Sequence, residues 1–366
     1  MNGDCRRVVN SAAPIRICDN GGWTDTWFAR YGKIFNVAVS PYVEVQIEAY
    51  ARDSRPERVT IYAENYGERY AMGYGRPGWD RHPLIEATVK RMGLPEDLAI
   101  EISIYCQAPG GASTGTSAAV CVTLIGALDR LRGGSLAAQE VAYLAHAVET
   151  EDLGQQCGIQ DQLCSALGGV NLIDMYDYPR AKVSGLNLSD ALWWELERRL
   201  VLVYSGRSHS SSEIHERVIR GLEDAGPDNA LLDALRATAE PSHDALLAGD
   251  FSALGRAMIA NTEAQRRLHP DLIGRDAQRI IDVARDHGAL GWKVNGAGGE
   301  GGSVSLLCAG RYHARRAMIR EIEQEDARFR HIPTTLSRLG LHTWEQVPGG
   351  TAATPSRGGA DDLAAS

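Results

Sequence analysis

Gln107-Ala-Pro-Gly-Gly-Ala-Ser-Thr-Gly-Thr-Ser-Ala-Ala119 lies between a β-type run, Leu98–Tyr105, and an apolar helical run, Ser117–Arg130. In such a segment the loop amides and the positive end of the helix dipole converge on one point, which is typical of an anion site. A Walker loop requires Lys where this chain has Thr116, so the segment is not of that class. The alternative for the segment alone is an ordinary glycine-rich turn with a Ser/Thr helix cap.

Composition indicates a globular protein that binds neither nucleic acid nor membrane. The 366 residues are 44% hydrophobic and 23% charged, and 38 basic against 47 acidic residues give a net charge of −9. The seven cysteines form no CxxC pair, which suggests neither a zinc site nor a disulfide framework. The longest apolar run, Ala118–Leu128, is too short to span a bilayer. We expect a cytoplasmic location.

Hydrophobic periodicity predicts two domains of mixed α and β structure. The first half has β-type runs and then helices, and a polar stretch near residues 180–198 is the expected boundary. Residues 1–185 and 195–348 are the predicted domains, and 349–366 is a predicted disordered tail. Further predicted strands are Val43–Ala49, Val59–Ala63, Leu200–Tyr204 and Ser303–Cys308, and further predicted helices are Leu84–Met92, Ala137–Thr150, Ser211–Leu222, Ala230–Ala239, Phe251–Leu268 and Arg275–His287.

Three other segments are candidates for chemistry. Lys293–Gly302 has five glycines in seven residues, more than a tight turn needs, which indicates close approach of the backbone to another group. Glu149 closes a predicted helix and Asp161 follows twelve residues later. Such a pair would supply a magnesium ligand and a group that faces an attacking hydroxyl. The alternative is that both carboxylates are simply solvated.

Ala13–Asp25 combines Arg16, a Gly-Gly bend and a Trp23/Asp25 pair, a combination typical of charge stabilisation and carbohydrate contact. The alternative for this segment is a strand followed by a turn with an Asp cap. The Ser- and Arg-rich segment Ser205–His215 would face a polar substrate.

In this order the segments resemble the motifs of the GHMP kinase superfamily, over residues 13 to about 308. Arg16–Asp25 is similar to the first motif of the sugar kinases, and its GGWTD is closer to the fucokinase and heptose-phosphate kinase branches. Pro109–Ala119 resembles the phosphate-binding motif P-x-G-x-G-L-G-S-S-A, from which it departs at Ser113, Thr114 and Thr116. Gly158–Gln162 resembles the segment with the catalytic aspartate, and Lys293–Gly302 resembles the third motif, with Glu300 replacing a glycine.

The resemblance implies an α+β, two-domain GHMP kinase fold: an N-terminal domain like domain 2 of ribosomal protein S5, and a ferredoxin-like C-terminal domain. It implies that Asp161 and Arg16 are catalytic and that Ser117 and Glu149 bind Mg²⁺. The residues expected to bind ATP are Pro109, Gly110, Gly111, Ala112, Ser113, Thr114, Gly115, Thr116 and Ser117, and those expected to bind the sugar are Trp23, Thr24, Asp25, Arg207, Asn295 and Gly296.

The expected activity is transfer of the ATP γ-phosphate to the anomeric hydroxyl of a sugar or sugar phosphate, with a heptose 7-phosphate or longer sugar phosphate favoured. The sugar 1-phosphate product would feed nucleotide-sugar biosynthesis. For a distal phosphate, Arg207, Lys33 and serines 208 and 210–212 are candidate ligands. The alternatives are a kinase for an unphosphorylated sugar, a sugar sensor without turnover, and an ATP-dependent decarboxylase, which the GGWTD segment disfavours. A monomer or homodimer is expected.

Overall fold

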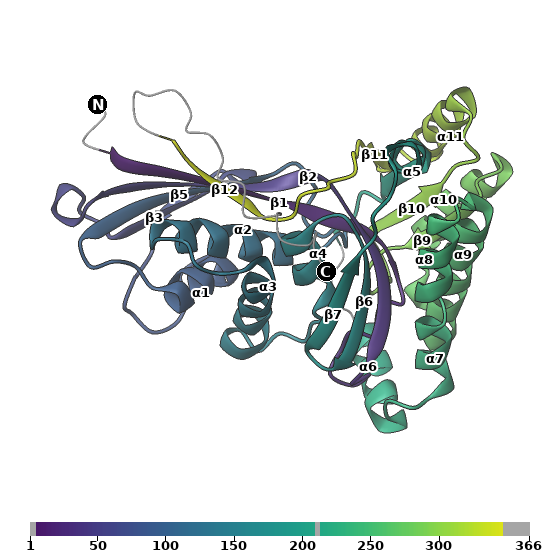
Figure 1. Cartoon of the computed structure of the whole chain (residues 1–366), viewed down its shortest axis with the longest axis horizontal. Coiled ribbons are helices and arrows are strands. Elements are labelled where there is room, and N and C mark those ends of the chain that lie inside the picture. Colours follow the sequence, from purple (N-terminus) through teal and green to yellow (C-terminus); the bar gives the residue numbers. More distant parts are fainter. Residues whose placement is uncertain (1–4, 209–212, 347–366) are drawn as a thin grey trace, which may run out of the picture.

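The computed structural model describes residues 5–208 and 213–346, arranged around two β-sheets (Figure 1). The larger sheet has eight strands in the order β12-β1-β2-β5-β3-β4, with β6 pairing to β2 and to β7. Its strands are β1 Cys5–Asn20, β2 Gly32–Ala51, β3 Val59–Ala63, β4 Glu68–Ala71, β5 Leu98–Cys106, β6 Val170–Asp177, β7 Arg180–Gly185 and β12 His342–Gln346. The predicted tail 349–366 lies outside the described residues.

Helices cover one face of this sheet and pack on its apolar side chains. Figure 1 shows α1, α2 and α3 together below the sheet. The helices of this half are α1 Pro83–Met92, α2 Thr116–Leu131, α3 Ala138–Ala147 and α4 Gln160–Leu167. Burial alternates along Tyr42–Ile47 of β2, as expected of a strand with one face on a core.

The smaller sheet has four antiparallel strands in the order β11-β8-β10-β9. They are β8 Leu200–Tyr204, β9 Gly291–Val294, β10 Ser303–Leu307 and β11 Arg330–Ile332. The helices of this half are α5 Asp190–Arg199, α6 Glu213–Ala225, α7 Ala230–Arg236, α8 Ala239–Leu247, α9 Phe251–Leu268, α10 Arg275–Asp286 and α11 Tyr312–Glu325. The mixture of helices and strands confirms the predicted α+β class.

Several predicted bounds differ from the structure. The predicted helix Ala137–Thr150 ends at Ala147 and continues as a π-helical turn, Val148–Asp152. The stretch expected as a boundary, 180–198, forms β7 and most of α5. The last strand, β12, pairs with β1 of the larger sheet, although the prediction grouped 195–348 together. This pairing covers an edge of β1 that would otherwise expose its backbone polar groups.

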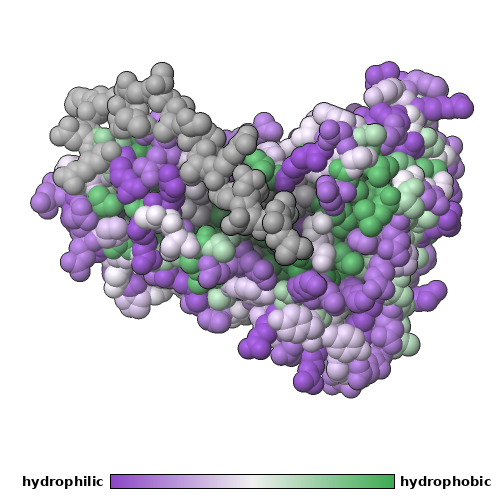
Figure 2. All heavy atoms as spheres, in the orientation of Figure 1, coloured by the Kyte–Doolittle hydropathy of each residue, from purple (hydrophilic) through white to green (hydrophobic). Residues whose placement is uncertain are grey.

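The surface is largely polar. In the view of Figure 2, hydrophilic residues dominate the outer rim of both halves, and apolar residues show mainly toward the middle and on the half that carries the smaller sheet. Among the helices of residues 5–208 and 213–346, none combines the length and the apolar character that crossing a bilayer requires.

Candidate active site

The loop between β5 and α2 presents an uncapped helix N-terminus. The N-cap Gly115 has φ 71°, and no side chain caps α2. Ser113 also has a positive φ, 57°, which is uncommon for a residue other than glycine and which clusters at functional sites. Because the first amides of a helix have no intrahelical acceptor, this loop is suited to bind an anion.

The second glycine run packs directly against this loop. A Cβ at Gly302 would lie 2.7 Å from the Ser113 hydroxyl oxygen, and one at Gly296 would lie 3.1 Å from the Ser113 Cβ. The Ser303 hydroxyl donates to the Ala112 carbonyl at 2.6 Å. The glycine run 293–302 was predicted to bring its backbone close to another group, and that group is the anion loop.

Arg16 on β1 and Asp161 on α4 form a bidentate ion pair. Arg16 Nε and Nη2 donate to the two Asp161 carboxylate oxygens at 2.7 and 3.2 Å, and Nη1 donates to the Ser113 carbonyl at 2.5 Å. Burial alone would disfavour the charged guanidinium, but Asp161 and Asp19 outweigh it and raise the pKa of Arg16. Arg16 thus remains a fixed cation between the anion loop and α4.

Glu149 lies in the π-helical turn, a local geometry that is frequent at functional sites. Burial raises the pKa of Glu149 to about 7; hydrogen bonds from Gln162 and Ser117 oppose this rise and the charge of Asp161 adds to it. Mg²⁺ prefers oxygen ligands and commonly takes only one or two carboxylates, with substrate phosphates completing its shell. The Glu149 carboxylate and the Ser117 hydroxyl, in mutual contact beside the anion loop, fit such an ion.

Asp25 holds the start of α4. Its carboxylate accepts the Gln160 N–H at 3.0 Å, and its backbone carbonyl accepts the Ile159 N–H at 3.3 Å. Gly158 leaves room for this contact, since a Cβ there would lie 1.9 Å from Asp25 Oδ2. Burial raises the pKa of Asp25 to about 6. Asp25 therefore helps to set the position of Asp161, one residue beyond Gln160.

Asp19 and Lys293 form a buried ion pair to which sequence reasoning assigned no role. Lys293 Nζ lies 3.4 Å from Asp19 Oδ1, and both side chains are 1% exposed. The other oxygen, Oδ2, accepts the Gly296 N–H at 3.0 Å, and Arg16 Nη1 lies 3.9 Å from Oδ1. Burial lowers the pKa of Lys293, against the opposing effect of Asp19. The only signal in the sequence was that both residues lie within candidate segments.

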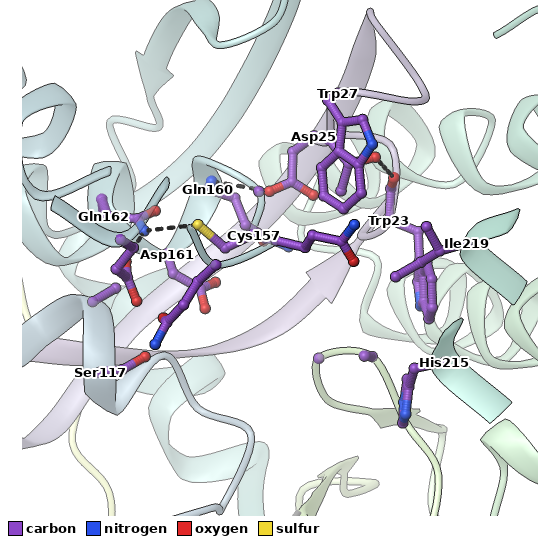
Figure 3. Close-up of a pocket in the computed structure, with 18 of the residues that line it drawn as sticks. Trp23, Asp25, Trp27, Ser117, Cys157, Gln160, Asp161, Gln162, His215 and Ile219 are labelled. Atoms are coloured by element: carbon purple, nitrogen blue, oxygen red, sulfur yellow. Dashed lines mark hydrogen bonds between the residues drawn. The ribbon is translucent and has the colours of Figure 1, made fainter. Parts of the chain in front are cut away.

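These segments surround one cavity of about 870 Å³. Figure 3 shows Asp161, Gln162 and Ser117 on one side of it, and Trp23, Ile219 and His215 on the other. The predicted site residues that line it are Arg16, Trp23, Asp25, Ser117, Glu149, Asp161 and Gly296; lining residues without a predicted role include Asp19, Trp27, Cys157, Glu216 and Ile219. The cavity thus has an anion-binding end and an aromatic end.

The aromatic end is built by both halves. Trp23, with φ 75°, stacks on His215 of α6 at 6.2 Å between centroids and 10° between planes. His215 Nε2 lies 3.0 Å from the Gly298 carbonyl. The loop around Trp23 and Phe28 packs against apolar side chains of α6, α7 and α9. His215 belongs to the segment expected to face a polar substrate, whereas His209 and serines 210–212 lie outside the described residues.

Three predicted sugar contacts do not line the cavity. The Thr24 hydroxyl donates to the Gly21 carbonyl at 2.7 Å within the turn. Asn295 Oδ1 accepts the Cys18 N–H at 3.2 Å, which ties β1 to the glycine run. Arg207 is exposed; its Nε lies 3.6 Å from Asp276 Oδ2, and its Nη1 lies 3.8 Å from Glu300 Oε2. Lys33, a candidate phosphate ligand, pairs with Glu240 outside the cavity. Each of these side chains has a partner within the protein, and its contact with a substrate stays a prediction.

Comparison with known proteins agrees with this geometry. Models of the GHMP kinase N-terminal and C-terminal domains match residues 83–169 and 242–322. The chain is 25% identical to D-glycero-alpha-D-manno-heptose 7-phosphate kinase of Campylobacter jejuni over 81% of this chain and 88% of that protein. It is 31% identical to mevalonate kinase of Thermococcus gammatolerans, over 64% of this chain and 70% of that protein.

A solved structure with the same fold is that of a D-glycero-D-manno-heptose 1-phosphate kinase from Bacteroides thetaiotaomicron. It superposes with a TM-score of 0.71 at 23% identity, over 92% of this chain and 98% of that one. The predicted two-domain fold is confirmed by both domain models and by this superposition. On the strength of the two domain matches and the Thermococcus relative, the chain belongs to the GHMP kinase family.

Proposed function

We propose that this chain transfers the γ-phosphate of ATP to a hydroxyl of a sugar. Family membership makes it an ATP-dependent small-molecule kinase; the sugar, its hydroxyl and the roles of the residues are the proposal. The observation that carries it is the position of the Arg16–Asp161 pair, between an anion loop and a cavity end of aromatic and carboxylate side chains. Aromatic faces with nearby carboxylates suit the C–H faces and hydroxyls of a sugar.

The proposed chemistry divides among few residues. Amides at the start of α2 hold the nucleotide phosphates, and Asp161 accepts or orients the proton of the attacking hydroxyl. Arg16 offsets negative charge on the transferring group. Ser117 and Glu149 would hold Mg²⁺, which would neutralise negative charge on the phosphates when bound. Asp25 and Trp23 position the sugar.

The anomeric hydroxyl is the proposed acceptor. The support is the likeness of Gly21-Gly-Trp-Thr-Asp25 to kinases that act at that position, together with the relative from Campylobacter jejuni whose name is that of a heptose 7-phosphate kinase. The product would be a sugar 1-phosphate, which nucleotidyl transfer consumes. Gly296, which lines the cavity beside Asp19, is a further candidate contact for the acceptor.

The test is ADP release from Mg-ATP across a panel of sugars and sugar phosphates, in wild type and in Asp161→Asn. Asn keeps the shape of the side chain but removes its charge, so turnover should fall by about 100-fold or more while ATP affinity stays nearly constant. Asp174→Asn, an exposed carboxylate on β6, is the matched control and should retain activity. Unchanged turnover in Asp161→Asn contradicts the assignment, and absence of turnover on every member favours a sensor.

A further inference from the structure

We infer that the phosphoryl acceptor is an uncharged sugar and not a sugar phosphate; this inference rests on the proposed function and names the substrate class of the same site. The relative from Campylobacter jejuni is named for a phosphorylated heptose. A sugar phosphate requires cations at the acceptor end of the cavity, whereas an uncharged sugar does not. The charges that face the cavity distinguish them.

Carboxylates outnumber cations along the cavity wall. The lining carboxylates are Asp19, Asp25, Glu149, Asp161 and Glu216, and the only Lys or Arg among the described lining residues is Arg16. Glu149 and Asp161 face the nucleotide end, where a metal ion and ATP would bind. At the acceptor end Asp19 is paired with Lys293 and Glu216 with Arg220, and the negative charge of Asp25 remains, which repels a phosphate.

Three of the five N–H groups of Arg16 are used within the protein. Its Nε and Nη2 donate to Asp161, and its Nη1 donates to the Ser113 carbonyl. In the proposed reaction this one cation already serves the transferring γ-phosphoryl group. A phosphate on the sugar would therefore lie beside carboxylates with no unpaired cation among the described lining residues, an arrangement that is less favourable than a neutral hydroxyl.

Three other cations of the half that carries the smaller sheet are already paired with carboxylates. Lys293 is 1% exposed and pairs with Asp19, and Arg220 pairs with Glu216 at 3.1 Å. Arg207 lies near Asp276 and Glu300. None of the three lines the cavity. Residues 209–212, whose sequence is His-Ser-Ser-Ser, contain neither Lys nor Arg.

The acceptor end has instead the features that bind neutral sugars. Trp23 stacked on His215 gives a flat apolar surface, and Trp27 and Ile219 line the same region (Figure 3). Carboxylates accept hydrogen bonds from sugar hydroxyls. Burial raises the pKa of Asp25 to about 6, because these surroundings disfavour a negative charge.

The experiment compares matched pairs in which only the terminal phosphate differs. Steady-state ADP release by the full chain is measured with D-mannose and mannose 6-phosphate, D-galactose and galactose 6-phosphate, and D-glycero-D-manno-heptose and its 7-phosphate. For every pair with turnover, kcat/KM should be at least about 100-fold higher for the uncharged member. Preference for a phosphorylated member overturns this inference and leaves the proposed kinase activity intact. Turnover on no pair defeats the proposed function and this inference with it.

A charge variant gives an independent readout. Glu216→Arg replaces a carboxylate that lines the cavity with a cation, and should narrow the preference for the uncharged member by about tenfold. Asp224→Arg makes the same charge change on the same helix at an exposed position away from the cavity lining, and should leave the ratio unchanged. Equal ratios in the two variants would show that cavity charge does not select the substrate.

Discussion

Gly158→Ala should disable the enzyme without touching the nucleotide loop. Gly158 precedes α4 and packs against Asp25. A Cβ at this position would lie 1.9 Å from Asp25 Oδ2 and 2.5 Å from its Cγ, far inside the 3.0 Å below which such contacts essentially never occur. The φ of Gly158 is not in the left-handed region, so the effect is steric. The Asp25 carboxylate must move, and it then loses its hydrogen bond from the Gln160 N–H.

The magnitude follows from these contacts. Forcing an extra methyl group into a packed site costs about 1–3 kcal/mol. Loss of a hydrogen bond to a charged acceptor costs about 1.5–3 kcal/mol. We expect the free energy of unfolding to fall by roughly 3–5 kcal/mol. The start of α4 shifts as well, and a displacement of Asp161 by about 1 Å lowers kcat by about 100-fold.

The assays are chemical denaturation for stability and ADP release at saturating substrate for kcat. Gly154→Ala is the control in the same loop: its Cβ meets open space, but φ is +64°, so only about 1 kcal/mol of backbone cost is expected. In an Asp25→Ala background the obstructing carboxylate is absent, and Gly158→Ala should then cost less than about 1 kcal/mol. Additive losses from the two substitutions would refute the steric argument.

Three further predictions follow from buried groups. Lys293→Met leaves Asp19 as a partly uncompensated buried charge, so chemical denaturation should show a free energy of unfolding lower by about 3 kcal/mol. A second substitution, Asp19→Leu, should restore most of this loss, and a larger loss in the double variant would contradict the argument. The pKa of Asp25 is raised by burial from 3.8 to about 6, so its stabilising contribution is present below about pH 4 and is lost as pH rises through 6. Unfolding free energies should therefore fall from pH 4 to 7 by about 2 kcal/mol more in wild type than in Asp25→Asn, and parallel curves would exclude the effect. Trp23→Ala should raise KM for the sugar by about tenfold and leave KM for ATP unchanged in steady-state kinetics; equal changes in both would indicate a general loss of structure.

Elements with strong local signals could be predicted from the sequence. Phe251–Leu268 was predicted as a helix and is α9 with those bounds, because it begins at Asp250, whose side chain accepts the Ala253 N–H. Leu200–Tyr204 is β8, a fully buried apolar run. The first half of β2 was missed because its residues are buried on both faces, so the alternation that marks a strand begins only after Ser40.

The polar contacts of the site could not be predicted because they join residues distant in sequence. Asp19 and Lys293 meet only after the two sheets pack, so neither had a recognisable partner in its own segment. The side-chain oxygen of Asn295, a predicted sugar contact, accepts the N–H of Cys18, which lies in a distant segment. Helical periodicity alone does not distinguish the π-helical turn at Glu149 from a continued α-helix.

The contacts between the two halves fix the distances between the parts of the site. Asn295 accepts the Cys18 N–H and Gly296 donates to Asp19, so the glycine run is fastened at two points to β1, the strand that carries Arg16. The anion loop, Arg16 and the acceptor end of the cavity are therefore held at one spacing by side chains that need not touch substrate. Catalysis by positioning is sensitive to displacements of about 1 Å. Residues at this junction should therefore influence kcat through the geometry that they maintain, although their side chains contact other parts of the protein. This role accounts for their position within the sequence motifs.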